Sequence, residues 1–250
     1  MTPVIIGNAT LYHGDALRVL SELPAGTAHC MITDPPYSSG GMLRGDRIQD
    51  VHTKYVQTES MSGHALQGFT GDSRDQFGYL LWVSIWVNEA RRVLVPGACV
   101  ALFTDWRQLP VTCSAIQSGG VVWRGIVPWH KPGARPVQGR WTNACEYLTW
   151  GTNGPRELAG SPLPGMYTAT PPRGEDRTHI TEKPVAVLED LSKIIAPDEV
   201  LLDPFMGSGT AGVACHVTGR RFIGIEADRQ IFDAACLRIE NAQRQERMFA

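Results

Sequence analysis

The fold is indicated most clearly by residues 200–212, which read VLLDPFMGSGTAG. The first three residues are apolar, as in a short buried strand, and the pattern of residues 208–218 is that of a helix. The glycines between them allow the backbone to approach a ligand closely at the start of that helix. A strand, a glycine-rich turn and a helix in this order are typical of a parallel α/β sheet that binds its ligand at the carboxyl end of a strand.

The next apolar run strengthens this interpretation. Residues 221–226 have the pattern of a second strand, and they end at Glu226, whose carboxylate can accept hydrogen bonds from both hydroxyls of a ribose. Gly207, Gly209 and Gly212 also satisfy the spacing G-x-G-x-x-G. These features predict a nucleoside cofactor, and a nicotinamide cofactor would satisfy the glycine spacing equally well.

Apolar runs and helix-like segments alternate along the whole chain. This alternation predicts a Rossmann-like α/β fold, with helices on both faces of a mostly parallel sheet of seven strands. Residues 130–145, which join the fourth strand to the fifth, show no helical periodicity, and this favours an antiparallel pair there. We expect strands at residues 10–13, 28–33, 98–104, 121–129, 146–150, 200–202 and 221–226, and helices at residues 15–23, 76–95, 107–118, 184–195, 208–218 and 229–247.

Composition bounds the class of protein. A chain of 250 residues is long enough to bury the core of one α/β domain. No stretch approaches the roughly 20 apolar residues that a membrane span needs. The N-terminus lacks the pattern of a secretory signal, which favours a cytoplasmic location. The six cysteines are scattered without a CxxC pair, so we expect buried free thiols and no structural metal.

The charges are distributed unevenly, although the net charge is only −2. Residues 106–145 contain no Asp or Glu, whereas residues 175–203 are rich in acidic side chains. A solvated loop would explain the first stretch by itself, and a surface that faces a polyanion explains it in combination with the motifs described below. The cations of this stretch are Arg107, Arg124, Lys131, Arg135 and Arg140.

Two segments do not fit the alternation of strands and helices. Residues 38–75 are rich in Gly, Ser and His, and residues 151–178 are rich in Pro and Gly. Loops of this length in a compact domain are usually functional or disordered. We therefore interpret the first as an inserted lid and the second as a short substrate-recognition segment, with an ordinary flexible insertion as the alternative for each.

A second motif, Asp34-Pro35-Pro36-Tyr37, directly follows the strand expected at residues 28–33. The two prolines fix an extended path and remove two N–H donors, so the turn offers the Asp34 carboxylate, the Pro35 carbonyl and the aromatic face of Tyr37. A base with an exocyclic amino group needs two acceptors and a stacking partner, and stacking on an aromatic ring is worth roughly 1–3 kcal/mol per base. A proline-stiffened β-turn is the structural alternative.

The positions of the two motifs favour the base-binding turn over the structural alternative. In a parallel sheet, the strands at residues 28–33 and 200–202 end at the same edge, where open α/β sheets bind their ligands. We therefore expect the cofactor and the base to meet there.

Taken together, these motifs resemble the β group of DNA amino-methyltransferases, in which the catalytic half of the chain precedes the cofactor half. Further matches are LYHGDAL at residues 11–17, TEKP at residues 181–184 and GIEAD at residues 224–228, so the resemblance spans almost the whole chain. It implies a circularly permuted order of the motifs, a seven-stranded sheet with one antiparallel strand near an edge, and S-adenosylmethionine as the methyl donor. It also implies DNA as the partner, with a homodimer and a restriction–modification setting as analogies.

The resemblance also assigns residues to roles. Asp34, Pro35, Pro36 and Tyr37 form the catalytic turn. Glu226 would bind the cofactor ribose, Asp15 would lie near its adenine amino group and Lys183 near its carboxylate. Without the resemblance, Asp15 would be interpreted as a helix cap and Lys183 as a surface lysine. The complete cofactor set is Asp15, Ala16, Lys183, Asp203, Phe205, Gly207, Ser208, Gly209, Thr210, Glu226 and Ala227.

The identity of the target base depends on Asp34. Similar enzymes that methylate cytosine N4 often carry serine at this position, so adenine N6 is favoured and cytosine N4 is the alternative. We expect the base to be flipped out of the duplex and to donate its amino hydrogens to Asp34 and to the Pro35 carbonyl, so that its nitrogen takes the methyl group by direct in-line displacement. The five cations would contact DNA phosphates.

Three other functions compete with this one. A nicotinamide-dependent dehydrogenase would explain the glycines and Glu226 but not residues 34–37. A DNA-binding module without catalysis would not need an intact catalytic turn. Methylation of RNA or of a protein amide is a third alternative, although similar enzymes that act on protein glutamine tend to have asparagine at the position of Asp34.

Overall fold

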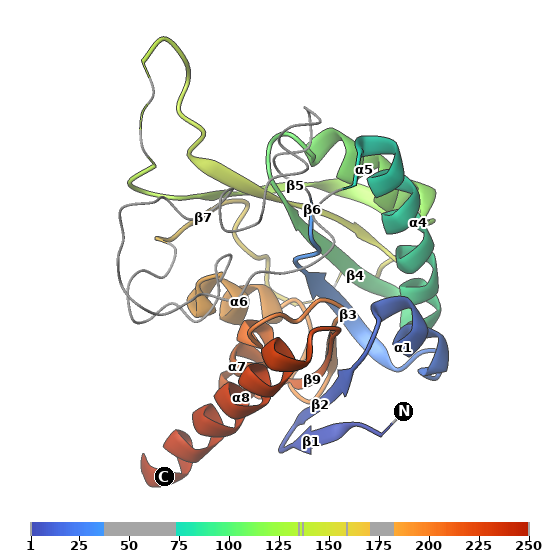
Figure 1. Ribbon diagram of the computed structural model, residues 1–250, viewed down its shortest axis with the longest axis vertical. Coiled ribbons are helices and arrows are strands. Elements are labelled where there is room, and N and C mark those ends of the chain that lie inside the picture. The colour runs from blue at the N-terminus through green and yellow to red at the C-terminus, as the bar shows by residue number, and fades with distance from the viewer. Residues whose placement is uncertain are drawn as a thin grey trace.

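The computed structural model describes residues 2–37, 74–134, 136, 138–158, 160–170 and 183–249, with side chains up to residue 244. The strands in these ranges are β1 (Val4–Ile6), β2 (Ala9–His13), β3 (Ala28–Thr33), β4 (Leu94–Thr104), β5 (Val122–His130), β6 (Cys145–Thr152), β7 (Tyr167–Thr168), β8 (Val200–Asp203) and β9 (Arg221–Glu226). They form one sheet in the order β1-β2-β9-β8-β3-β4-β6-β5-β7 (Figure 1).

Helices cover both faces of this sheet (Figure 1). In the described ranges they are α1 (Ala16–Glu22), α4 (Gln76–Val93), α5 (Leu109–Ser118), α6 (Val185–Ser192), α7 (Thr210–Val217) and α8 (Arg229–Phe249). Helices α1, α4 and α5 share one cluster of buried residues with the sheet, and α6, α7 and α8 share another. Along β4, Leu102 belongs to the first cluster and Phe103 to the second, as the pleat of a strand requires. The expected two-sided covering is therefore confirmed.

The sheet is mostly parallel, with an antiparallel strand in the expected place. β6 runs antiparallel between β4 and β5, which confirms the antiparallel pair expected on either side of residues 130–145. All seven expected strands are present. The expected total of seven is wrong, however, because β1 and β7 extend the sheet at its two ends.

β1 was missed because it lacks an alternating pattern. It is a three-residue strand antiparallel to β2, and its Ile5 side chain is 70% exposed. Ile6 pairs with Ala9, so Gly7 and Asn8 form a two-residue reversal, and Gly7 has a φ of +53°, which glycine adopts without a steric penalty. The Gly-Asn dipeptide between two apolar runs is the hairpin signal that could have identified this strand.

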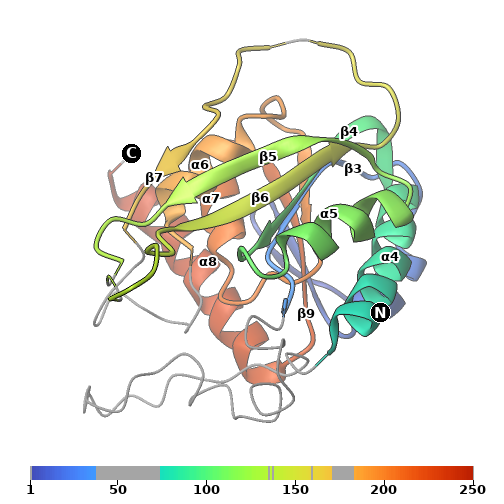
Figure 2. The same cartoon turned by 90° about the horizontal axis from the view of Figure 1, so that it is seen from above.

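The segment after β6 contains a strand where only a loop was expected. It arches over β5 from the far end of the sheet and returns to form β7 (Figure 2). Tyr167 is 8% exposed and its hydroxyl donates to the Asp190 carboxylate at 3.0 Å, which fixes this strand beside α6. The expectation of a long loop over residues 151–178 is thus wrong for residues 151–152, which belong to β6, and for residues 167–168. Residues 159 and 171–178 lie outside the described residues. The lid expected at residues 38–75 also lies outside them, apart from its last two residues.

The boundary between α4 and β4 also differs from the expected one. The helix ends at Val93 and the strand begins at Leu94, although the helix was expected to reach residue 95. Proline restricts the residue before it to extended conformations, so the helix ends ahead of Pro96.

The register of the sheet places the two motifs at one edge. Met31 of β3 pairs with Leu202 of β8, and Leu202 pairs with Ile223 of β9, all in parallel. The carboxyl ends of β3, β8 and β9 therefore lie side by side. Among the described helices, none is both long and apolar enough to cross a membrane.

Candidate active site

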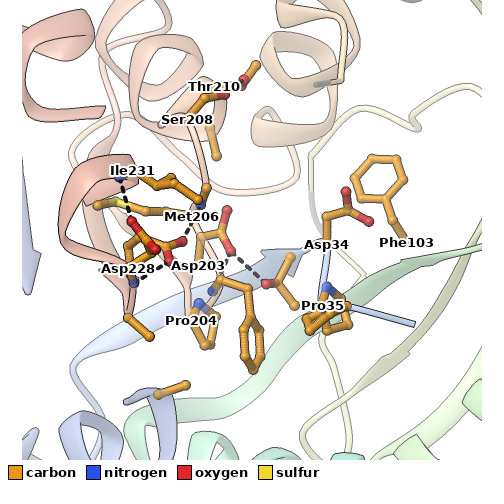
Figure 3. A pocket seen from close by; sticks show the side chains of 18 of the residues that line it. Asp34, Pro35, Phe103, Asp203, Pro204, Met206, Ser208, Thr210, Asp228 and Ile231 are labelled. Atoms are coloured by element: carbon orange, nitrogen blue, oxygen red, sulfur yellow. Dashed lines mark hydrogen bonds between the residues drawn. The ribbon is translucent and has the colours of Figure 1, made fainter. Parts of the chain in front are cut away.

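A pocket lies at this edge of the sheet, between the turn after β3 and the turn after β8 (Figure 3). The two turns are joined directly, because the Thr33 hydroxyl donates a 2.6 Å hydrogen bond to Asp203 Oδ1. This contact joins residues 170 positions apart in the chain, and it confirms the expectation that the two turns lie together. Every residue expected in the catalytic turn or the cofactor set lines the pocket except Gly209.

The glycine turn is shaped by backbone conformations that favour glycine. Gly207 has a φ of +50° and Gly209 a φ of +77°. A Cβ on Gly207 would have no protein atom within 4 Å. Because glycine has no side chain, this space beside the pocket stays open for a ligand. Gly209 forms the N-cap of α7, and a Cβ there would approach Ile239 and Ala235 of α8 to 3.1 and 3.2 Å. Gly209 therefore serves packing, and Gly207 leaves room for a ligand.

Arg238 of α8 holds the same turn from behind. Its guanidinium donates to the Ser208 carbonyl at 3.3 Å, to the Ser208 hydroxyl at 3.0 Å and to the Thr210 hydroxyl at 3.1 Å. Charge-assisted bonds to three oxygens fix the path of the turn.

Glu226 ends β9 and faces the glycine turn. Its two carboxylate oxygens accept the backbone N–H groups of Gly207 at 3.1 Å and of Asp228 at 2.9 Å. Burial raises the pKa of Glu226, and these N–H bonds oppose that rise. Each oxygen keeps a second lone pair, so the carboxylate can still accept hydrogen bonds from a ribose.

Asp203 ends β8 and is 5% exposed. Besides Thr33, the Phe205 backbone N–H donates to its Oδ1 at 3.1 Å. Burial raises the pKa of Asp203 to about 7, although both hydrogen bonds act to lower it. A carboxylate of this kind can stabilise the positively charged amino group of an amino-acid ligand.

Asp34 follows β3 and is the only titratable residue of the catalytic turn besides Tyr37. Its Oδ2 accepts a hydrogen bond from the Lys183 ammonium group. Its Oδ1 is buried and has no hydrogen-bond partner among the described residues. Burial raises the pKa of Asp34, the Lys183 charge lowers it, and the Glu146 charge raises it. An acceptor that is buried and unpaired is suited to an incoming N–H donor.

Lys183 lines the pocket together with the rest of the expected cofactor set apart from Gly209. Its Nζ contacts Asp34 and lies 3.5 Å from Glu146 Oε2, and the position near the cofactor carboxylate that the resemblance implies stays a prediction. Glu146 itself was missed by the sequence analysis. The signal that could have found it is a single acidic side chain near the start of an otherwise apolar strand, at the edge where the motifs were expected.

The remaining expected site residues surround the cofactor turn. Asp15 is the N-cap of α1, since its Oδ1 accepts the Arg18 backbone N–H at 3.0 Å, and it lines the pocket as well. Ala16 is buried behind it, and Ala227 follows Glu226 at the rim. Phe205 packs against Trp82 and Trp86 of α4, with ring centroids 5.3 and 5.0 Å apart, and Trp82 forms an aromatic wall that the sequence analysis missed.

Four of the five cations expected to contact DNA are among the described residues, and they lie on different segments of the fold. Arg107 pairs with Asp105 at 3.3 Å and Lys131 with Glu146 at 2.7 Å. Arg124 lies six residues before the end of β5, about 20 Å along the strand from the pocket edge. Arg140 is exposed in the connection between β5 and β6, which projects beyond the sheet (Figure 1, upper left). Arg135 lies outside the described residues.

Metal ions in proteins are bound by groupings of His, Cys, Asp and Glu side chains. Within the described ranges, no three side chains of His, Cys, Asp or Glu are grouped so that they could bind a metal ion.

Comparison with known sequences identifies a matching family and a relative of similar length. A family model described as DNA methylase matches residues 28–170 and 156–236. The Escherichia coli (strain K12) protein named "Putative methylase YubD" is 29% identical over 237 residues, which cover 92% of this chain and 90% of that protein.

Solved structures share the fold. The crystal structure of the M1.HpyAVI-SAM complex has a TM-score of 0.65 and 23% identity, covering 92% of this chain and 98% of that one. The PvuII DNA methyltransferase, described as cytosine-N4-specific, has a TM-score of 0.68 and 16% identity, covering 96% of this chain and 91% of that one. At these identities the likeness concerns the fold alone.

Proposed function

The chain belongs to the N6/N4 DNA methylase family, and we propose that it transfers a methyl group from S-adenosylmethionine to the N6 amino group of adenine in DNA. Membership of this family makes the protein a DNA amino-methyltransferase. The base that it methylates and the roles of its residues belong to the proposal. The family also favours methyl transfer over the nicotinamide chemistry that the glycine spacing alone allowed.

One observation carries the proposal. The catalytic turn and the glycine turn line the same pocket, and the bond from Thr33 to Asp203 holds them together. A methyl donor on one turn and a base on the other would therefore meet within one enclosure, where correct positioning accounts for much of the rate of a transfer reaction.

The residues of the glycine turn fit the methyl donor. Glu226 would accept the ribose hydroxyls, and the open space beside Gly207 would admit the cofactor close to the backbone. Asp203 would face the amino group of the methionine portion. When bound, S-adenosylmethionine supplies an activated methyl group that the target nitrogen takes by direct in-line displacement.

The catalytic turn fits a flipped base. The amino group would donate one hydrogen to the unpaired Asp34 Oδ1 and the other to the Pro35 carbonyl, while the ring stacks on Tyr37. These two acceptors draw the nitrogen lone pair away from the ring. The negative charge of Asp34 also stabilises the positive charge that develops on the nitrogen as the new bond forms.

Adenine is favoured over cytosine because of the side chain at position 34. A carboxylate is a stronger acceptor than a serine hydroxyl, and it is the group that the resemblance associates with adenine. Cytosine N4, the specificity printed for the PvuII enzyme, is the alternative that an experiment must separate.

DNA would lie across the edge of the sheet that carries the pocket. Arg140, on the projecting connection between β5 and β6, is best placed to contact a phosphate, since Arg107 and Lys131 are paired with carboxylates. We propose residues 151–178 as a contributor to recognition of the target sequence, because their path returns to this edge at β7 (Figure 2).

Digestion of methylated DNA to nucleosides tests the proposed target. The protein is incubated with unmodified DNA and S-adenosylmethionine that carries a labelled methyl group, and the digested nucleosides are separated. We expect label in N6-methyldeoxyadenosine. Label in N4-methyldeoxycytidine would contradict the adenine assignment, and no label in any nucleoside would favour a DNA-binding module without catalysis.

A further inference from the structure

A row of alternating charges crosses the pocket edge of the sheet. Lys131 Nζ lies 2.7 Å from Glu146 Oε1, and Glu146 Oε2 lies 3.5 Å from Lys183 Nζ, which in turn contacts Asp34 Oδ2. These side chains come from the end of β5, from β6, from the segment before α6 and from the turn after β3. The tertiary fold, and not local sequence, brings them together.

Lys183 is the centre of this row. Its side chain is 7% exposed, and its ammonium group lies 5.1 Å from the centroid of the Phe103 ring. A buried ammonium ion is costly unless opposite charges surround it. Asp34 and Glu146 supply those charges, and together they raise the pKa of Lys183 above its usual value although burial acts to lower it. The lysine is therefore held as a cation.

The consequence for Asp34 is a fixed orientation. One carboxylate oxygen is bound to Lys183, and the other is buried without a hydrogen-bond partner among the described residues. A carboxylate held in this way presents a single oxygen to a ligand. Lys183 also lies 3.5 Å from Glu146, so its positive charge is divided between two carboxylates and is not used to neutralise Asp34 only.

We propose that Lys183 and Glu146 are positioning residues for methyl transfer: Lys183 holds the Asp34 carboxylate in one orientation and favours its charged form, and Glu146 holds Lys183 in place, so that the free oxygen of Asp34 can accept a hydrogen bond from the amino group of the target base. This inference rests on the proposed function of the pocket. It gives Lys183 a different role from the cofactor contact that the family resemblance implies.

The two positioning residues act on Asp34 in opposite directions. The charged groups that face it are Lys183, Glu146, Lys131 and Asp203, and Arg74 lines the pocket from the side of α4. The Lys183 charge lowers the pKa of Asp34, and the Glu146 charge raises it. Because the ionised carboxylate is the stronger acceptor and stabilises the positive charge that develops on the target nitrogen, the pKa of Asp34 sets the acidic limb of the activity profile.

Substitution of each residue should therefore move that limb in a predictable direction. Lys183→Met removes a positive charge, so the pKa of Asp34 rises and the acidic limb of kcat moves to higher pH by about one unit or more. Glu146→Gln removes a negative charge, so the limb moves to lower pH. We also expect kcat of Lys183→Met at neutral pH to fall by about tenfold or more, with the Kd of the cofactor within a few-fold of the wild-type value.

The experiment measures kcat against pH at saturating cofactor and DNA, and the Kd of S-adenosylhomocysteine by calorimetry. A carbon-13 NMR titration of Asp34 in the cofactor-free protein gives its pKa without any need for activity. Lys183→Arg restores a cation and should return the limb toward the wild-type pH. Lys193→Met is the matched control, because Lys193 pairs with Asp190 at 3.0 Å on the surface of α6 and should leave the profile unchanged.

Two results would overturn the inference. A Lys183→Met protein whose cofactor Kd rises steeply while its acidic limb stays in place would show that the lysine binds the cofactor instead. Limbs that move in the same direction in Lys183→Met and Glu146→Gln would show a general structural effect. Failure of the proposed function is distinguishable from both, since the wild-type protein would then transfer no methyl group to DNA.

Discussion

Replacing Asp34 by asparagine is expected to lower kcat by about 1000-fold while the Kd of the cofactor changes little. Asparagine has nearly the same shape, but its amide is uncharged and can turn a donor toward the amino group of the base. Two donors would then face each other, and the positive charge that develops on the nitrogen would lose its counter-charge. The measurement is the initial rate of methyl transfer to unmodified DNA at saturating substrates.

Asp190→Asn is a suitable control for this substitution. Asp190 also contacts a lysine and a hydroxyl group, through Lys193 and Tyr167, but it does so on α6 and does not line the pocket. The control should keep the wild-type rate. An Asp34→Asn protein that retained a kcat within tenfold of wild type would remove Asp34 from the chemistry.

Substitution of Gly207 by alanine is expected to weaken cofactor binding by about tenfold or more, because an extra methyl group in a closely packed site costs about 1–3 kcal/mol. The space beside Gly207 is free of protein atoms within 4 Å of the new Cβ and lies at the pocket. The methyl group would therefore occupy the place of the ligand. Calorimetric titration with S-adenosylhomocysteine measures the effect.

Gly219→Ala separates this effect from backbone strain. Gly219 has a φ of +70° and likewise no atom within 4 Å of an added Cβ, but it follows the end of α7 and is not part of the pocket. Both substitutions should destabilise the fold by about 1 kcal/mol, and only the first should weaken binding. Equal cofactor affinity in the two variants would contradict the position assigned to the cofactor.

The sequence predicted the parts of the site that depend on local motifs. Residues 34–37 and 203–210 each follow an apolar strand, and parallel pairing brings the ends of such strands to one edge. Their contact through Thr33 and Asp203 is a consequence of that rule, so the pocket could be foreseen although these two residues are 170 positions apart in the chain.

The sequence could not predict contacts that depend on how the antiparallel strand β6 pairs with β4 and β5. Glu146 reaches Lys183 only because β6 is inserted between β4 and β5, and no motif marks that pairing. Trp82 is one of several aromatic residues on α4, and only the tertiary structure shows that Trp82, and not Trp86, lines the pocket. For the same reason the sequence could not show how far Arg124 lies from the pocket, since its position along β5 depends on where the strand starts.

The most direct test of a shared pocket is the affinity of one bisubstrate compound. In this compound a short linker joins N6 of adenosine to the cofactor, at the place of the transferable methyl group. Tethering makes the second contact intramolecular, so two adjoining sites should bind this compound at least about tenfold more tightly than S-adenosylhomocysteine. Tyr37→Ala should abolish that advantage, because the base would lose its stacking partner. Equal affinity for the two compounds in the wild-type protein would contradict the claim that the base and the methyl donor meet between the two turns.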